Sequence, residues 1–381
     1  MLKFITAGES HGKCMIAVVE GFPAGVHLDE EAINEDLRRR QGGVGRGPRM
    51  DIEKDEVEIL SGIRTGETLG SPICMRIKNY DSSIDRLPEL TKARPGHADL
   101  AGAMKYGCHD MRNVLERASA RETAARVAAG ALAKILLGNF GIKVLGYVKG
   151  IGGVIDETPA KDPDEVQRQR DSSSIYCLDK KAEERMINRI KEATDAKDSV
   201  GGLIEVTVYG VPPGLGNYTQ WDQRLDGRLA GAVMSVQAIK GVELGYGLQV
   251  AEKLGSEVHD SIYYDQKLRS DSLTGGFFRK TNRAGGLEGG VTNGEPIIVR
   301  AAMKPIPTLR KSLESVELTT KKGALAAAER SDVCAVPAAS VVVEAVVSFE
   351  IAKAFMEKFG GDSIQETSRN LEGYLKQVRS L

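Results

Sequence analysis

Short runs of apolar residues divide the chain into predicted strands and helices. Residues 203–209 alternate apolar and polar side chains, which is the period of a strand. Residues 14–20, 57–60 and 297–303 are also predicted to be strands. A short apolar segment and the sequence Gly-Glu-Ser-His-Gly precede residue 14, so the first two strands are expected to form a hairpin whose tip carries His11.

Four segments have the pattern of helices. Residues 30–40 combine an apolar stripe with acidic residues at the start and arginines at the end, which suits the helix dipole, and Asp29 can cap the first turn. The clearest helical pattern spans 120–138. Two further helices are predicted near 181–193 and over 340–360.

The helix predicted over 120–138 carries two local signals. Ser119 and Glu122 have the spacing of a capping box. The alanines and Gly130 leave little side-chain bulk, which predicts close packing against another element. Ser119 itself can cap the helix, which is the usual role of such a serine, or it can help the first turn to bind an anion.

The order of the predicted elements favours the α+β class. Strands and helices are mixed without the regular alternation that builds a parallel sheet. Internal repeats and an obvious linker are both absent from the sequence. We therefore expect a single domain over residues 1–381.

The charge balance excludes some partners. The 52 basic and 53 acidic residues give a net charge of -1, so no basic excess draws the chain to nucleic acid or to a membrane surface. No apolar run approaches the ~18 residues of a membrane span, and the residues around Lys3 do not resemble a secretory signal. The five cysteines lack a metal-binding spacing, which predicts free thiols, no metal site and a cytoplasmic location.

Arginine next to glycine recurs in segments predicted to be loops. Glycine allows close approach of a ligand, and the planar guanidinium group matches phosphate and carboxylate. Several such sites favour a small molecule with more than one anionic group, although a single arginine of this kind is more often an exposed surface residue. The arginines in question are Arg46, Arg49, Arg94, Arg117 and Arg121, with Arg330 in a less glycine-rich setting.

Other side chains could carry proton transfer or contact a ligand. His11 and His97 lie in glycine-rich settings, where each is either an acid–base group or a structural turn residue. Asp332 is either a base or a helix or turn cap. The segment 304–308 is stiffened by two prolines, and the glycine-rich segment 284–296 is predicted to be a loop.

Nine motifs occur in a fixed order and cover nearly the whole chain. They are GESHG, RRRQGGVGRGPRM, SSIDRLPELTKARPGHADL, RNVLERASARETAARVAAGALAK, DSVGG, MSVQAIKGVELG, GGLEGGVTNG, MKPIPT and RSDVCAVPAAS. Together they closely resemble chorismate synthase. The resemblance implies a β-α-β sandwich core and a homotetramer.

The resemblance also implies an activity and a cofactor. The family catalyses the last step of the shikimate pathway, in which 5-enolpyruvylshikimate 3-phosphate loses phosphate from C3 and hydrogen from C6 to give chorismate. It requires reduced FMN although the reaction is redox neutral, and NADPH is a possible reductant. The substrate carries one phosphate and two carboxylates, which agrees with the arginines noted above.

Three residues match catalytic positions of the family. His11 resembles the histidine beside the substrate phosphate, where it can protonate the leaving group. His97 resembles the histidine near the N1 and C2 carbonyl of the flavin, where it controls the charge of the reduced ring. Asp332 resembles the carboxylate near flavin N5, which helps N5 to accept the C6 proton.

The binding residues implied by the resemblance fall into three groups. The substrate anions would be held by Ser10, Arg40, Arg46, Arg49, Arg94, Ser119, Arg121 and Arg330. FMN would contact Arg117, Ala118, Ser119, Gln237, Ala238, Gly289, Lys304, Pro305, Ile306, Pro307, Thr308 and Arg330. Arg40 and Arg46 also match positions assigned to NADP, and the sequence does not separate the two uses. The chain departs from the family pattern at Pro48, which stiffens its loop, and at Thr292, which keeps the hydroxyl group usual there.

Two other functions compete with that of a chorismate synthase. A flavin-free enzyme acting on another phosphorylated small molecule could use the same arginines. An RNA-binding protein could use the Gly-Arg segment, but the net charge of -1 and the 5% aromatic content argue against it.

Overall fold

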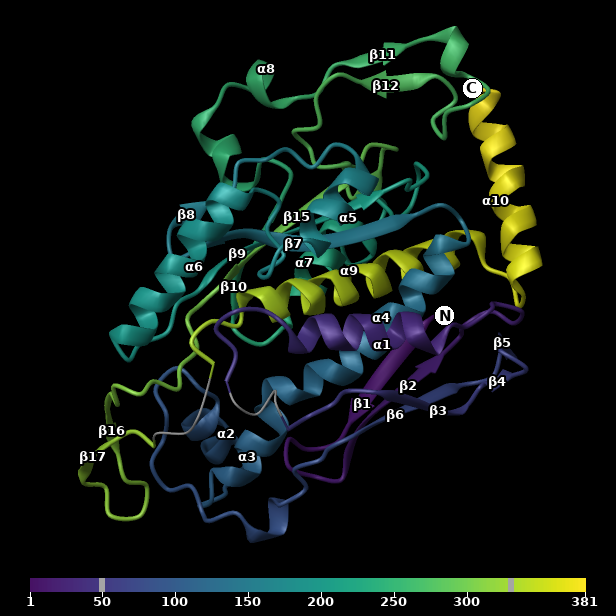
Figure 1. Ribbon diagram of the computed structural model, residues 1–381. Helices are drawn as coiled ribbons and strands as arrows, with labels where there is room; N and C mark the ends of the chain where they lie inside the picture. Colours follow the sequence, from purple (N-terminus) through teal and green to yellow (C-terminus); the bar gives the residue numbers. More distant parts are fainter. Residues whose placement is uncertain (48–51, 328–331) are drawn as a thin grey trace.

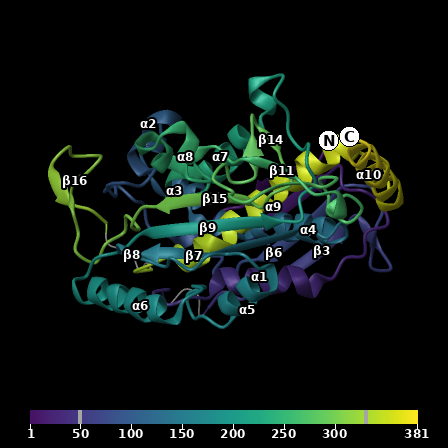
Figure 2. The same cartoon turned by 90° about the horizontal axis from the view of Figure 1, so that it is seen from above.

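Two antiparallel sheets enclose a layer of helices in the computed structural model, which describes residues 1–47, 52–327 and 332–381 (Figures 1 and 2). The first sheet contains, in spatial order, β1 (Lys3–Ala7), β2 (Cys14–Glu20), β6 (Ile73–Lys78) and β3 (Val57–Ser61). The second contains β10 (Ile239–Leu244), β15 (Ile297–Met303), β9 (Gly202–Tyr209), β7 (Lys143–Ile151) and β8 (Val154–Ile155).

The helix layer joins the two sheets into one core. It contains α1 (Glu30–Gln41), α4 (Thr123–Gly138), α7 (Leu225–Met234) and α9 (Val336–Phe359). α4 packs on β2 of the first sheet, and α9 packs on β7 and β9 of the second. Nearly every side chain of α9 is buried because neighbours surround it on all sides, which explains why its sequence is apolar around its whole circumference.

Small residues set the spacing between α4 and α9. A Cβ atom added at Gly130 would lie 2.4 Å from the Cβ of Ala345, so any larger residue would push the two helices apart. The close packing predicted from Gly130 and its neighbouring alanines is therefore confirmed.

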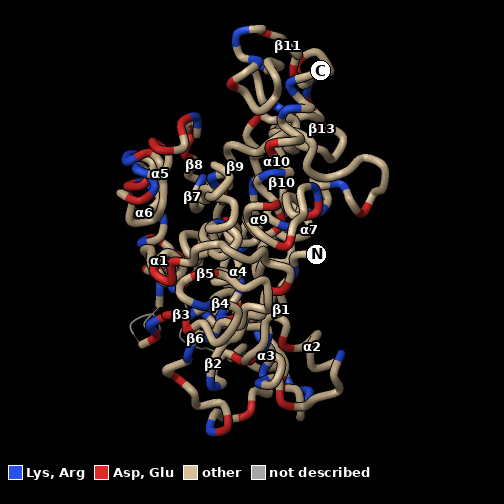
Figure 3. The backbone as a smooth tube through the Cα atoms, turned by 90° about the vertical axis from the view of Figure 1, so that its right-hand side faces the viewer, with Lys and Arg blue, Asp and Glu red and all other residues tan. Residues whose placement is uncertain are grey.

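Further helices and strand pairs surround this core. The helices are α2 (Asp99–Tyr106), α3 (Arg112–Ala118), α5 (Pro163–Asp171), α6 (Lys180–Asp195), α8 (Gly255–Val258) and α10 (Ile364–Arg379). Two-stranded pairs are β4–β5 (Ile63–Arg64, Glu67–Thr68), β11–β12 (Ile262–Tyr264, Phe277–Arg279), β13–β14 (Leu287–Glu288, Val291–Thr292) and β16–β17 (Glu314–Val316, Gly323–Leu325). Basic and acidic residues are mixed along α5 and α6 (Figure 3).

The predicted strands and helices are present, and the α+β class and the β-α-β sandwich are confirmed. The hairpin of β1 and β2 and the Asp29 cap of α1 also form as predicted. Two boundaries differ, since the helix predicted over 120–138 begins with a 3-10 turn at Ala120–Glu122 and the last long helix starts at Val336 rather than 340. Residues 284–296 contain the hairpin β13–β14 rather than only a loop.

The capping box predicted at Ser119 and Glu122 is wrong. The Ser119 hydroxyl does accept a hydrogen bond from the backbone N–H of Arg121, at 3.3 Å. The Glu122 carboxylate turns away and instead accepts from Thr6 at 2.7 Å and from Arg126 at 2.9 Å. Thr6 on β1, which is distant in the sequence, therefore takes the place of the backbone N–H of Ser119 that the capping box would have used.

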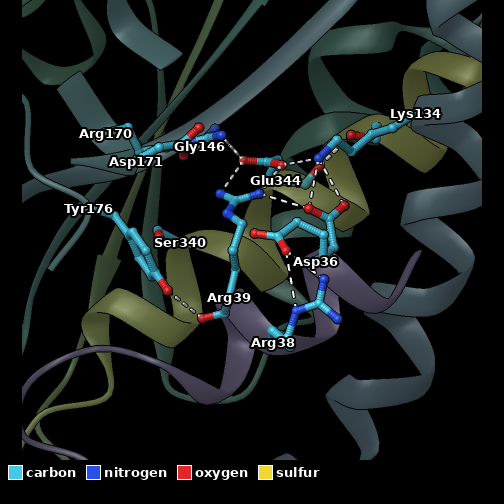
Figure 4. A network of polar contacts seen from close by, with 12 residues as sticks. Asp36, Arg38, Arg39, Lys134, Gly146, Arg170, Asp171, Tyr176, Ser340 and Glu344 are labelled. Atoms are coloured by element: carbon cyan, nitrogen blue, oxygen red, sulfur yellow. Dashed lines mark hydrogen bonds and ion pairs between the residues drawn. The ribbon is translucent and has the colours of Figure 1, made fainter. Parts of the chain in front are cut away.

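A buried network of charges connects the helix layer to the second sheet (Figure 4). Glu344 of α9 accepts two hydrogen bonds from Arg39 of α1, at 2.9 and 3.1 Å. It also accepts from Lys134 of α4 at 2.5 Å, from Arg170 of α5 at 3.1 Å and from the backbone N–H of Gly146 in β7 at 2.7 Å. One carboxylate thus joins five elements.

Asp36 completes the network by accepting from Arg39 and Lys134. Burial alone would raise the pKa of Glu344, but the positive charges of Arg39, Lys134 and Arg170 hold this pKa well below its usual value. Glu344 is only 1% exposed, so removing it would leave cations buried without their main partner.

We predict that Glu344→Ala lowers the free energy of unfolding by about 3–5 kcal/mol, the usual cost of removing one partner of a buried ion pair. Chemical denaturation monitored by circular dichroism measures this change. The matched control is Glu372→Ala on the exposed face of α10, which should change stability by less than about 0.5 kcal/mol. Equal stability of the Glu344 variant and the parent would contradict a structural role for the network.

Candidate active site

The loop that carries His11 is the tip of the β1–β2 hairpin. Gly8 has a φ of +109°, and a Cβ atom there would lie 2.3 Å from the carbonyl oxygen of Cys14, so only glycine fits. The amide of Asn79 donates to the carbonyl oxygens of Glu9 and Gly12, at 3.0 and 2.9 Å. The tip is therefore held at both ends of the segment that contains the histidine.

His11 contacts a buried carboxylate on α3. Glu116 lies 2.8 Å from the ring Nδ1 of His11 and accepts from its backbone N–H at 2.7 Å. Burial by itself would raise the pKa of Glu116, but these hydrogen bonds and the nearby positive charge lower it below its usual value. Glu116 is therefore a carboxylate that faces a histidine.

Two predicted anion-binding arginines share another buried carboxylate. Asp55 accepts from Arg40 at 3.0 Å and from Arg121 at 2.5 Å. Arg40 also donates to Thr123 and to the carbonyl oxygen of Ala120, and Arg121 donates to Asn79 and to the carbonyl oxygen of Lys78. Both guanidinium groups are thus fixed in place before any ligand binds.

These arginines create a concentrated positive charge. Burial is the largest cause that lowers the pKa of Arg40 to about 10, and the neighbouring charges of Arg121 and Arg46 lower it further, against the opposite effect of Asp55. Such a region favours a bound anion, which would relieve the repulsion between the guanidinium groups.

The loop after α1 meets the segment before α9. Asp332 forms an ion pair with Arg46 and accepts from the backbone N–H of Gly47 at 2.6 Å. The backbone N–H of Val333 donates to the carbonyl oxygen of Gly45 at 2.8 Å. Asp332 therefore binds a different loop instead of capping α9, whose N-terminal cap is Ala335. Arg49 and Arg330 lie outside the described residues.

A second group of side chains surrounds His97. Asp99 lies 2.6 Å from the Nδ1 of His97 and accepts from Arg94 at 2.8 and 2.9 Å. Arg94 also donates to the hydroxyl of Thr308 at 3.4 Å. Burial would raise the pKa of Asp99, but Arg94 and His97 hold it far below the usual range. Both predicted catalytic histidines are thus paired through Nδ1 with buried carboxylates.

The proline-containing segment connects this group to the second sheet. The backbone N–H of Lys304 donates to the carbonyl oxygen of Ala238 at 3.0 Å, and its ammonium group donates to the carbonyl oxygen of Gly96. Burial and the charge of Lys240 lower the pKa of Lys304. Lys304, the first residue of the segment 304–308, therefore connects the loop that carries His97 to Ala238, which follows α7.

Gln237 links these residues to the hairpin of His11. Its side-chain nitrogen donates to Glu122 at 3.2 Å, and Glu122 is bonded to Thr6 of β1. The side-chain oxygen of Gln237 is buried and has no hydrogen-bond partner among the residues that the structure describes. A buried acceptor of this kind suits a ligand with an N–H group.

Residues 117–119 lie against the same hairpin. Arg117 donates to the carbonyl oxygens of Thr6 and Gly8, each at 3.0 Å. The hydroxyl groups of Ser119 and Ser10 are 3.1 Å apart. By contrast, Gly289 lies in the turn between β13 and β14, and within the described chain it forms no hydrogen bond to another predicted site residue. The structure thus brings together most, but not all, of the predicted residues.

Sequence reasoning missed the carboxylates that hold the site together. They are Asp55, Asp99, Glu116 and Glu122, and all are buried. Asp99 had a local signal, since it follows His97 by two positions in the same motif. Glu116 had none, because its partner His11 is 105 positions away in the sequence.

Two surface hollows elsewhere are weaker candidates. In the first, Asp156 is already occupied by the backbone N–H groups of Thr158, Leu178 and Asp179. In the second, Arg228 is paired with Glu350 and Glu357. Over the part of the chain that the structure describes, no group of three metal-ligating side chains occurs, and no helix has the length and apolar character needed to cross a membrane.

The fold and the paired histidines among buried arginines are typical of an enzyme that acts on a small anion. The family model for chorismate synthase matches residues 2–356. Curated chorismate synthases from Pelobacter propionicus and Geobacter metallireducens are each 54% identical to the chain, with full coverage of both sequences. A solved structure described as a chorismate synthase is 43% identical, has a TM-score of 0.82 and covers 100% of this chain and 99% of that one. The chain belongs to the chorismate synthase family.

We predict that Asp99→Asn weakens the acid dependence of stability. Because folding depresses the pKa of Asp99, its contribution is fully present above the unfolded value of about 3.9 and is lost progressively as the pH falls from there through the lower pKa of the folded state. The variant should be less stable than the parent by about 3–5 kcal/mol at pH 7, and the difference should shrink in acid.

Urea unfolding midpoints between pH 7 and pH 3 test this prediction. Glu184→Gln, at an exposed position of α6, serves as the control and should follow the parent at every pH. A difference between Asp99→Asn and the parent that stays constant with pH would contradict the ion-pair interpretation.

Proposed function

We propose that the chain catalyses the 1,4-elimination of phosphate from 5-enolpyruvylshikimate 3-phosphate to give chorismate, the last step of the shikimate pathway, as a lyase that requires reduced FMN. The observation that carries this proposal is the pairing of His11 and His97 with buried carboxylates among arginines, within the fold of the family.

The arginines match the charge of this substrate. A phosphate and two carboxylates need several cationic partners. Arg94 lies beside His97, while Arg40, Arg46 and Arg121 lie close enough for the charges of Arg46 and Arg121 to act on Arg40. Arg40 and Arg121 are almost fully buried, and all their nitrogens already donate to the protein. They therefore act mainly through their charge and by fixing the shape of the site.

The elimination needs one group that donates a proton and one that helps to accept a proton. The C3–O bond breaks as phosphate leaves with the bonding electrons, and His11 supplies a proton to the departing oxygen. The C6–H bond also breaks, its bonding electrons enter the new conjugated double bonds, and Asp332 would help to take up the proton that leaves C6. His97 would set the charge of the bound cofactor from the other group of residues.

Residues of this chain fit the flavin. The unpartnered side-chain oxygen of Gln237 would accept a hydrogen bond from the cofactor, and Ala238 and Lys304 lie beside it. Residues 304–308, 117–119 and Gly289 complete the proposed binding set, together with Arg330. Reduced FMN, when bound, supplies an electron-rich ring beside the reacting carbons. NADPH is a possible reductant, with Arg46 better placed than the enclosed Arg40 to contact it.

We also propose a cytoplasmic homotetramer of single-domain subunits. A single core cluster contains residues of both sheets and of the helix layer, which supports one domain. The β11–β12 ribbon projects from this body (Figure 1) and exposes Ile262, Tyr264 and Phe277. Because an isolated two-stranded ribbon is only marginally stable, contact with another subunit would stabilise it. This exposed apolar surface supports association between subunits.

We predict that the purified protein releases phosphate and forms chorismate only when FMN and a reductant such as dithionite are present. Chorismate absorbance and phosphate release measure the reaction, and flavin spectra recorded on adding substrate measure binding. Equal turnover without flavin would contradict the requirement for reduced FMN. Flavin binding without any turnover would contradict the proposed reaction.

We predict that Asp332→Asn binds FMN and substrate but turns over at least about 10²-fold more slowly, because the amide cannot accept a proton. Asparagine can still accept from Gly47 but loses the ion pair with Arg46, so a residue that only ordered the loop would show weaker binding or lower stability rather than a slow chemical step. Single-turnover kinetics with pre-reduced FMN separate chemistry from binding. An unchanged rate in the asparagine variant would reduce Asp332 to a structural role.

A further inference from the structure

We infer that Glu116 is a positioning residue for His11, which it holds with Nδ1–H directed inward and Nε2 available to the site. The catalytic part of this inference rests on the proposed function, whereas the orientation of the ring can be tested without it.

Glu116 holds both parts of the same residue. One carboxylate oxygen contacts Nδ1 of the His11 ring at 2.8 Å, and the other accepts from the His11 backbone N–H at 2.7 Å. The backbone carbonyl of Glu116 adds a third contact by accepting from the N–H of Ser10 at 2.8 Å. These contacts restrict both the position of the loop and the rotation of the ring.

The pairing has the burial that a positioning role requires. The Glu116 side chain is 2% exposed, whereas the His11 side chain is 16% exposed, so the ring is the more accessible partner of the pair. Both hydrogen bonds described for the Glu116 carboxylate come from His11, and Arg112 on the preceding turn contributes positive charge. The carboxylate therefore remains ionised and acts as an acceptor.

An ionised carboxylate selects one tautomer of the histidine. It accepts from Nδ1–H, so the neutral ring carries its lone pair on Nε2, and the protonated ring carries its second N–H there. Nε2 is then the atom that can transfer a proton to a leaving group.

His97 and Asp99 share this arrangement, with Nδ1 at 2.6 Å from the carboxylate. Asp99, however, also accepts two hydrogen bonds from Arg94, so a change there would disturb an arginine as well. Glu116 is the better residue to change, because the hydrogen bonds described for its carboxylate are both to His11.

The decisive variant is Glu116→Gln. Glutamine keeps the size of the side chain, but its NH₂ group can donate to Nδ1, which favours the opposite tautomer. Nitrogen NMR of protein labelled at histidine, without flavin or substrate and at a pH above the imidazole range, reports which ring nitrogen carries the proton. The chain has five histidines, and His11→Asn identifies the signal of His11.

We expect the parent to show His11 protonated on Nδ1 and Glu116→Gln to lose this preference. In turnover assays kcat should fall by about 10²-fold, within the range of general acid catalysis, while KM changes little. Glu116→Asp keeps the charge and should recover part of kcat. Glu205→Gln, which removes a buried carboxylate bonded to Tyr147 and Arg300, should leave the His11 signal and KM unchanged.

A parent protein with His11 protonated on Nε2 would overturn the inference, as would a Glu116→Gln variant with the parent's tautomer and kcat. If the parent has the expected tautomer but forms no chorismate, the positioning of His11 stands and the proposed function fails. If the parent is active and only the tautomer is wrong, the proposed function stands and the role of Glu116 fails.

Discussion

The buried carboxylate of Glu344 holds α1 and α9 together, and in this way it keeps the loops that carry Arg46 and Asp332 next to each other. It binds Arg39 near the end of α1, while it belongs to α9 itself. Arg40 follows Arg39, and the loop to Arg46 begins just beyond, where the hydroxyl of Tyr176 donates to the carbonyl oxygen of Arg39 at 2.9 Å. Asp332 precedes α9. A shift of either helix would therefore separate Arg46 from Asp332.

Buried ion pairs often contribute little net stability, since removing charges from water costs about as much free energy as the pairing returns. The geometry of the site gives another reason for them. Asp55, Asp99 and Glu116 hold their arginines and histidines in one arrangement before a ligand enters. A polar site that is already oriented needs little reorganisation when charge develops, and this is a major source of catalytic power.

The long motifs predicted the family and named many of the residues that lie together in the structure, because each motif keeps several polar residues within a few positions of one another. Arg94 and His97 are an example, and they do lie together in the structure. Local reasoning failed where a distant partner competed. Glu122 had the spacing to cap the turn at Ser119, yet it binds Thr6 on β1 and Gln237. The resemblance implied that Arg40 binds a substrate or NADP anion, yet its guanidinium group is enclosed by Thr123 and Asp55.

The sequence by itself determined several of the strands and helices, the α+β class and the resemblance to chorismate synthase, since these depend on periodicity and on motifs of neighbouring residues. Only the tertiary structure decided which carboxylate serves which cation or histidine. His11 and Glu116 are 105 positions apart, and Arg39 and Glu344 are 305 apart. Hydrogen bonds act over about 3 Å, so their partners are fixed only when the helix layer and the two sheets have packed together.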